Sequence, residues 1–306
     1  MTTISEPVTE AARGMADRAL SWLHAHRELG GLPPDTTETM ADPDSVYKPL
    51  GETTLAASLI LRDGVAGPGR LVAAQSLMDF TWEQFRRGDM IYERQLRHTL
   101  MTDPLEMYAP FVRCGYRHEG LDRLLAHRSR TRSVNSVEVL PNRRLAVANA
   151  ARVVGLEHAE DMKALAGATW LGAMPEPWAI NWITAYAMTH TVFHLTDWGG
   201  NPGGLPAELA SYLHAWLPVW IEVWREVGQW DLVTELLIVG ASLEDPYCRP
   251  EDWEAIAGLQ HEDGFVPRDS DPVADDPRQR FTDHQHTVVV TAVAGSIALA
   301  RAAGRR

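Results

Sequence analysis

The chain has 306 residues, of which 45% are hydrophobic, and it carries a formal net charge of −13. The hydrophobic content is sufficient for a large core in a single domain. The acidic balance argues against binding to nucleic acids and to anionic membranes, because phosphate groups are bound by clustered Lys and Arg. Cys114 and Cys248 are far apart, so neither a disulfide framework nor a zinc knuckle is expected.

The N-terminal segment lacks the basic and apolar regions of a signal peptide. No apolar run reaches the roughly 18 residues that a membrane-spanning helix needs. We therefore expect a soluble, cytoplasmic protein. Arginine supplies nearly all positive charge, with Lys48 and Lys163 as the only lysines, a bias that is typical of GC-rich bacterial genomes.

Apolar residues at spacings of three and four predict helices along the whole chain. The predicted helices cover roughly 9–29, 51–63, 69–87, 90–101, 104–114, 119–129, 142–154, 158–171, 178–198, 206–226, 229–242, 250–260 and 286–303. Short Gly and Pro turns join them, so neighbours should pair as antiparallel hairpins. We predict an all-α single domain over residues 1–306, an α/α toroid of about six helical hairpins. An α-solenoid is the alternative, although no repeat period is visible.

Two stretches interrupt the helical pattern for longer, residues 32–50 and 261–285. The second stretch is rich in Asp, Pro and Arg and is too long for a simple turn. Long ordered loops in compact domains are often lids or binding loops. Residues 261–285 are therefore a candidate active-site loop.

Polar residues form a stripe on the predicted helix 178–198, where Tyr186, His190, His194 and Asp197 follow at steps of four, four and three. Two imidazoles one turn apart can bind a metal, with Asp197 as a third ligand, although the glutamate of His-Glu-x-x-His is missing. The same geometry suits acid–base catalysis, because a carboxylate can orient an imidazole that titrates near neutrality. In a third interpretation the histidines only hydrogen-bond to neighbouring helices.

A second polar cluster, residues 283–287, precedes the last apolar segment. Thr282 or Asp283 is expected to cap the helix that begins there. The open N–H groups of its first turn would favour a bound anion or a developing negative charge. His286 is the better candidate for the site than His284, because valines continue a buried face around it.

Asp231 and Glu235 lie four residues apart on the otherwise apolar helix 229–242. They lie either on its exposed edge or in a cavity, where burial would raise their pKa. In a toroid alternate helices line the inner ring, so His190, Asp231 and His286 would share that ring. His190 comes late in its helix and His286 at the start of another, so parallel helices would place them at different heights.

Tryptophans crowd the second half of the chain, and the stripe of Trp216, Trp220 and Trp224 is typical of helix packing. Trp198 differs because it adjoins Asp197. It could line the pocket or bind a cation over its ring.

Residues 259–267, Leu-Gln-His-Glu-Asp-Gly-Phe-Val-Pro, resemble the helix-end repeat of terpenoid cyclases and protein prenyltransferase β-subunits. Residues 47–52, 189–199 and 231–237 resemble poorly characterised bacterial α/α-toroid proteins, many from actinomycetes. The resemblance implies the fold and no reaction. Residues 273–277 supply neither the Asp-x-Asp-Asp acid of a class II cyclase nor paired acidic clusters for magnesium.

P-loop, dinucleotide-binding and Gly-x-Ser-x-Gly motifs are absent from the sequence, so nucleotide and acyl-enzyme mechanisms have no support. We expect a cofactor-independent acid–base enzyme of bacterial specialised metabolism, acting on a small or carrier-protein-bound substrate as a cyclase or a lyase. A histidine oriented by Asp197 would remove a proton, while His286 and the nearby helix start support the leaving group or oxyanion.

The expected catalytic residues are His190, His194, Asp197 and His286. The expected substrate-binding residues are Glu52, Tyr186, Trp198, Asp231, Glu235 and Asp283. One alternative is a metal-dependent enzyme that uses His190, His194 and Asp197 as ligands. Another is a noncatalytic ligand-binding or partner subunit, and the chain could form a homodimer.

Overall fold

The computed structural model describes residues 4–38, 46–157 and 160–304. Within these ranges the regular structure is helical, no strand occurs, and no helix is both long and apolar enough to span a membrane. The α-helices are α1 (Glu6–Ala25), α3 (Lys48–Asp63), α4 (Pro68–Gln84), α5 (Asp89–Arg97), α6 (Asp103–Arg113), α7 (Glu119–Arg128), α8 (Arg132–Asn135), α9 (Pro141–Val154), α10 (Met162–Gly167), α11 (Trp182–Leu195), α12 (Ala207–Glu226), α13 (Trp230–Ser242), α14 (Pro250–Leu259) and α15 (Pro277–Ala302). Short 3-10 helices are η1 (Arg27–Gly30), η2 (Arg86–Gly88), η3 (Leu171–Ala173), η4 (Pro177–Ala179) and η5 (Pro202–Gly204).

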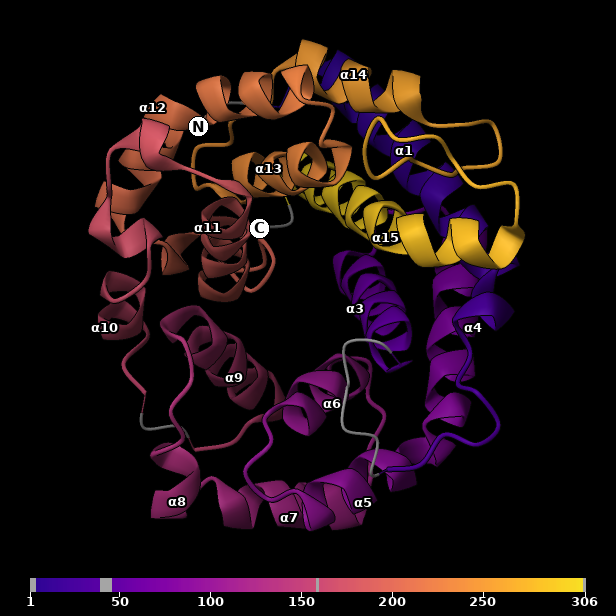
Figure 1. Ribbon diagram of the computed structural model, residues 1–306, viewed down its shortest axis with the longest axis vertical. Helices are drawn as coiled ribbons and strands as arrows, with labels where there is room; N and C mark the ends of the chain where they lie inside the picture. Colours follow the sequence, from indigo (N-terminus) through magenta and orange to yellow (C-terminus); the bar gives the residue numbers. More distant parts are fainter. Residues whose placement is uncertain (1–3, 39–45, 158–159, 305–306) are drawn as a thin grey trace.

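Six helices, α3, α6, α9, α11, α13 and α15, form an inner layer around the centre of the molecule (Figure 1). Each packs against the next, and the ring closes because α15 contacts α3. Outer helices such as α1, α4, α12 and α14 surround this layer (Figure 1). From α9 onward the chain alternates between the two layers, as helical hairpins with short turns do. The all-α prediction is confirmed, and the assignment to the α/α toroids stays a prediction.

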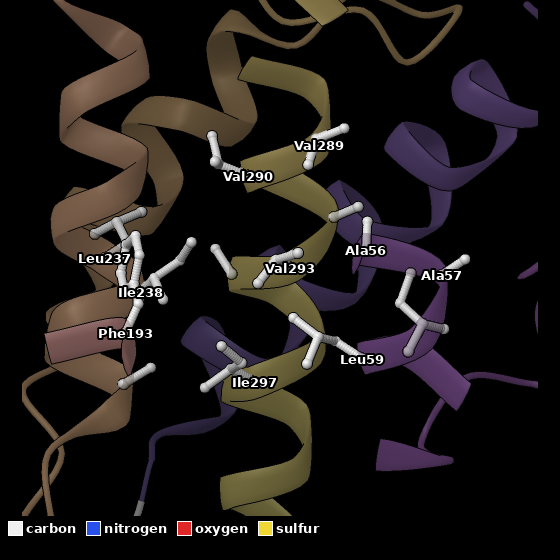
Figure 2. Close-up of a cluster of buried hydrophobic side chains, with 14 of the residues drawn as sticks. Ala56, Ala57, Leu59, Phe193, Leu237, Ile238, Val289, Val290, Val293 and Ile297 are labelled. Carbon is white, nitrogen blue, oxygen red and sulfur yellow. The ribbon is translucent and has the colours of Figure 1, made fainter. Parts of the chain in front are cut away.

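The hydrophobic core holds α15 between its inner neighbours. Figure 2 shows Val289, Val293 and Ile297 of α15 beside Leu59 of α3 and Ile238 of α13. All five side chains are buried, and each contributes about 1.5–3 kcal/mol to folding through the area removed from water. The packing therefore fixes α3, α13 and α15 relative to one another.

The start of α15 differs from the prediction. Asp276 caps the helix, because its Oδ1 accepts a hydrogen bond from the backbone N–H of Gln279 at 2.8 Å, and Pro277 occupies the first turn. The predicted helix 286–303 therefore begins nine residues too late, and the predicted loop 261–285 is helical from Pro277. The first two turns of α15 are mostly polar and exposed, so they show no apolar periodicity.

Other helix boundaries also differ from the predicted ones. The predicted helix 178–198 begins at Trp182, because Asn181 and Thr184 form a capping box that starts α11 there. Of the predicted helix 158–171, residues 158–159 lie outside the described residues, and the remainder is helical only in the short α10 and at Leu171, where η3 begins. Of the irregular stretch 32–50, residues 39–45 lie outside the described residues.

Helices α1 and α15 approach each other closely at Gly295. A Cβ atom at that position would lie 2.4 Å from the carbonyl oxygen of Ala12 and 2.7 Å from the Cβ of Ala16. Only glycine fits such a contact without movement of one helix. The contact therefore sets how closely α15 packs against the outer layer.

Candidate functional site

Four inner helices bring five ionisable residues together, which we call the acid–histidine cluster. Glu52 comes from α3, His190 from α11, Asp231 and Glu235 from α13, and His286 from α15. Ion-pair contacts of 2.8–3.7 Å connect them. All five were candidates from sequence, and the structure places them in one constellation.

The expected difference in height between the histidines disappears because α15 begins at Pro277. His286 is then ten residues into its helix, and His190 is nine residues into α11. Both imidazoles consequently reach the same carboxylate, that of Glu235. Because α15 begins earlier than predicted, its histidine segment lies at the same height as that of α11.

The two ring nitrogens of His286 have different partners. Nδ1 lies 2.8 Å from Oε1 of Glu52, which is the length of a good hydrogen bond. Because an ionised carboxylate only accepts, Nδ1 is the donor. Nε2 faces two buried oxygens at longer range, 3.4 Å from Oε1 of Glu235 and 3.7 Å from Oδ2 of Asp231. A neutral ring would therefore direct its lone pair at two carboxylates.

Hydroxyl groups hold both carboxylates of α13. The Tyr186 hydroxyl donates to Oδ2 of Asp231 at 2.7 Å, and Thr287 donates to Oδ1 at 3.0 Å. Thr189 donates to Oε2 of Glu235. Burial, followed by the negative charge of Asp231, raises the pKa of Tyr186. Sequence reasoning missed Thr189 and Thr287, although each is the direct neighbour of a candidate histidine.

His190 is the more accessible imidazole of the cluster. Its Nε2 lies 3.5 Å from Oε1 of Glu235, and 40% of its side chain is exposed, compared with 32% for His286. Its ring meets those of Tyr186 and Phe193 at centroid distances of 6.4 and 5.7 Å. A molecule that enters from solvent can thus contact His190.

Burial and mutual charge shift the protonation of the cluster. Burial raises the pKa of Asp231, and the charge of His286 only partly opposes it. Burial would also raise the pKa of Glu235, but His190 and His286 outweigh it and hold this pKa below its usual value. Burial would lower the pKa of His286, but Glu52 and Asp231 raise it well above normal. The protons of this cluster are therefore shared among strongly interacting groups.

Asp197 lies in a different constellation, which we call the arginine cluster. Its Oδ1 accepts from Arg113 at 2.6 Å and from Asn149 at 3.1 Å. Its Oδ2 lies 3.3 Å from a guanidinium nitrogen of Arg152 and 3.5 Å from one of Arg62. Three permanent positive charges from α3, α6 and α9 thus converge on one carboxylate.

The expected pairing of His190 with Asp197 is absent from the structure. Helix α11 ends at Leu195, and Asp197 and Trp198 adopt left-handed backbone angles with φ of 47° and 53°. This turn takes Asp197 off the histidine face. The metal ligand set of His190, His194 and Asp197 is therefore not assembled.

Three further candidates lie apart from the acid–histidine cluster. The His194 ring lies 6.2 Å from that of His190, and burial, then the charges of His190 and Arg143, keep its pKa well below normal. Trp198 stacks on Phe193 at a centroid distance of 4.4 Å. Asp283 accepts a hydrogen bond from Gln279 on the surface side of α15.

The expected anion site at a helix start beside His286 is wrong, because the first turn of α15 lies at residues 277–280. The segment before α15 instead supports the cluster through its backbone. The carbonyl of Arg268 accepts from the N–H of Asp231, and the N–H of Arg268 donates to Nδ1 of His284, both at 3.0 Å. Part of the candidate loop therefore fixes the N-terminal end of α13 against α15.

Comparison with known proteins gives a family and no activity. A model of the family DUF6895, described as a domain of unknown function, matches residues 16–296. No curated protein and no solved structure matches the chain. The matched range includes both the acid–histidine cluster and the arginine cluster.

Proposed function

The chain belongs to the family DUF6895, and we propose that it is an enzyme that transfers protons on a small-molecule substrate at the acid–histidine cluster. One observation carries the proposal: Oε1 of Glu235, a residue only 1% exposed, lies within 3.5 Å of two imidazoles. Burying such charges costs several kcal/mol per ion, and apolar residues of similar size are often at least as stabilising. A function that needs these groups explains why they occupy the interior.

The exposure of each group assigns its role. His190 is half-exposed and is the base that meets the substrate. Glu235 contacts its ring, orients it and stabilises the proton that it takes up. His286 is held by Glu52 at Nδ1, contacts Oε1 of Glu235 through Nε2, and supports negative charge on the reacting molecule.

The reaction class that fits these roles is elimination or ring closure. His190 takes a proton from the substrate, and the released electron pair forms either a double bond or a ring bond as the leaving group departs. The lyase and the cyclase predicted from the sequence share this step. A small or carrier-bound substrate in bacterial specialised metabolism remains the proposed class.

Conversion of a metabolite pool tests the proposal without a known substrate. The purified protein is incubated with a pooled bacterial metabolite extract, and mass spectrometry follows each compound over time. Wild-type protein should convert one compound in molar excess over itself. His190→Gln should abolish the conversion while leaving the melting temperature unchanged, and His214→Gln on the outer helix α12 should behave as wild type.

A compound that is only depleted in proportion to the protein, with no product formed, would instead establish a ligand-binding subunit. Retained conversion by His190→Gln would show that the base is another group. Either result overturns the proposed role of the cluster. Circular dichroism of each variant separates loss of activity from loss of folding.

A further inference from the structure

The buried carboxylates of α13 lack a permanent positive partner. Asp231 and Glu235 are 3% and 1% exposed, and among the residues that the structure describes no Lys or Arg forms an ion pair with either. With Glu52, the cluster has three carboxylates and two imidazoles. The ammonium of Lys48 lies 3.8 Å from Oε1 of Glu52. Among the described residues, Asp231 and Glu235 have only imidazoles as ion-pair partners, and these are positive only when protonated, so the two carboxylates can accept a further cation.

The separations of the inward-facing atoms are those of metal ligands. Nε2 of His286 lies 3.4 Å from Oε1 of Glu235 and 3.7 Å from Oδ2 of Asp231, and the three residues offer ligand atoms that all lie within 4.8 Å of one another. Hydrogen bonds between such groups are shorter, about 2.9 Å. Tetrahedral ligands with bonds of about 2.1 Å to Zn²⁺ are separated by about 3.4 Å.

The surrounding hydrogen bonds orient each ligand as they do around metals. Glu52 occupies Nδ1 of His286, so Nε2 is the nitrogen that faces the carboxylates of α13, which is the carboxylate–histidine arrangement found behind metal-binding imidazoles. Thr287 holds Oδ1 of Asp231, and Thr189 holds Oε2 of Glu235. The oxygens that face His286 are therefore presented toward a common point.

We infer that Asp231, Glu235 and His286 bind a divalent metal ion, and that Zn²⁺ fits their spacing. The inference rests on the proposed function only in placing the ion at the same cluster. Three protein ligands leave a fourth tetrahedral position for water or substrate, as in catalytic zinc sites. The ion replaces the cofactor-independent mechanism expected from sequence, and it takes over the support of negative charge from His286, because Nε2 of His286 becomes a ligand. Its ligands differ from the set expected from sequence.

The ion and His190 would divide the reaction between them. A substrate carbonyl bound at the open position would be polarised by the ion, or a leaving group bound there would be stabilised by it. His190, which contacts Glu235 from α11 and is not one of the three ligands, accepts the substrate proton. The electron pair of the broken bond to hydrogen then forms the new bond while the leaving group departs toward the ion.

Metal analysis and titration of the full chain test the inference. Purified wild-type protein should contain about one equivalent of metal by mass spectrometry, or bind one Zn²⁺ in calorimetry after treatment with EDTA. His286→Gln, Glu235→Gln and Asp231→Asn should each weaken binding by at least about 100-fold, and Glu52→Gln by about 10–100-fold. His190→Gln should keep the metal and lose turnover, while His214→Gln keeps both.

Cobalt substitution gives a readout that a structural role would not affect. Co²⁺ added to metal-free protein should produce the strong visible absorption of a tetrahedral ion, and Zn²⁺ should displace it. The signal should be absent in His286→Gln. Since EDTA treatment changes no residue, the wild-type result holds even if a variant fails to fold.

The possible failures are distinguishable. Metal-free protein with full activity, or equal Zn²⁺ binding by wild type and the three ligand variants, overturns the metal site and leaves the proposed function standing. Stoichiometric binding that the ligand variants abolish, without any conversion of metabolites, confirms the site and overturns the proposed function.

Discussion

Around Asp197 three guanidinium groups converge on one carboxylate, whereas in the acid–histidine cluster three carboxylates converge on two imidazoles. Both constellations join inner helices across the ring. The positive charges of the arginine cluster are guanidinium groups, which do not titrate near neutrality. The acid–histidine cluster depends on groups that gain and lose protons. Permanent charge is suited to holding helices together, while the exchangeable charge is suited to chemistry.

Removing the anion of the arginine cluster should have the largest effect on stability. Asp197→Asn leaves Arg113 buried without its 2.6 Å partner, and breaking a buried ion pair from one side costs about 3–5 kcal/mol. Urea denaturation should show this loss in the free energy of unfolding. A loss below about 1 kcal/mol would mean that the three arginines do not depend on Asp197.

Removing the metal ion should have the next largest effect on stability, and this effect should depend only on the acid–histidine cluster. At free Zn²⁺ of 100 times its dissociation constant, binding stabilises the folded state by about 2.7 kcal/mol. EDTA should therefore lower the melting temperature of wild type and of Asp197→Asn to a similar extent. It should not change the melting temperature of Glu235→Gln, and a change there would place the ion elsewhere.

Neutralising a carboxylate of the acid–histidine cluster should have a smaller effect on the stability of the metal-free protein. Glu235→Gln removes one of three negative charges, while Glu52 and Asp231 remain to pair with His286. We expect the free energy of unfolding to fall by about 1–2 kcal/mol, because His190 and His286 outweigh burial, hold the pKa of Glu235 below its usual value and so stabilise its ionised form. A loss as large as that of Asp197→Asn would erase the contrast between the clusters.

The smallest effect is expected at the edge of the arginine cluster. The Arg152 side chain is 54% exposed, and exposed ion pairs contribute about 0–1 kcal/mol. Arg152→Gln should therefore lower the free energy of unfolding by less than about 1 kcal/mol in urea denaturation. An effect equal to that of Arg113→Gln would show that exposure does not weaken this pair.

Sequence periodicity was sufficient for the helical class because most helices bury an apolar face. It failed where a helix begins in solvent, as at residues 277–283, because exposed polar turns carry no such pattern. The start of α15 is set instead by the Asp276 cap and Pro277. That local signal was present in the sequence and outweighs the missing periodicity.

The sequence was sufficient to predict most residues of the site but not which of them contact one another. Spacing on α11 and α13 identified His190, Asp231 and Glu235, since helical neighbours four residues apart share a face. The same rule misplaced Asp197, because it assumes that the helix continues, and α11 ends at Leu195. Which carboxylate meets which imidazole depends on contacts between helices, which a single sequence does not contain.

The close contact between α1 and α15 at Gly295 also affects the position of the acid–histidine cluster. It lies nine residues from His286 on the same helix, about 13 Å along the axis. A methyl group there would push α15 away from α1, and shifts of about 1 Å at a reacting group can lower rates by about 100-fold. Gly295 thus allows the close packing of α15 on α1 that keeps the imidazole of His286 aligned with its carboxylate partners.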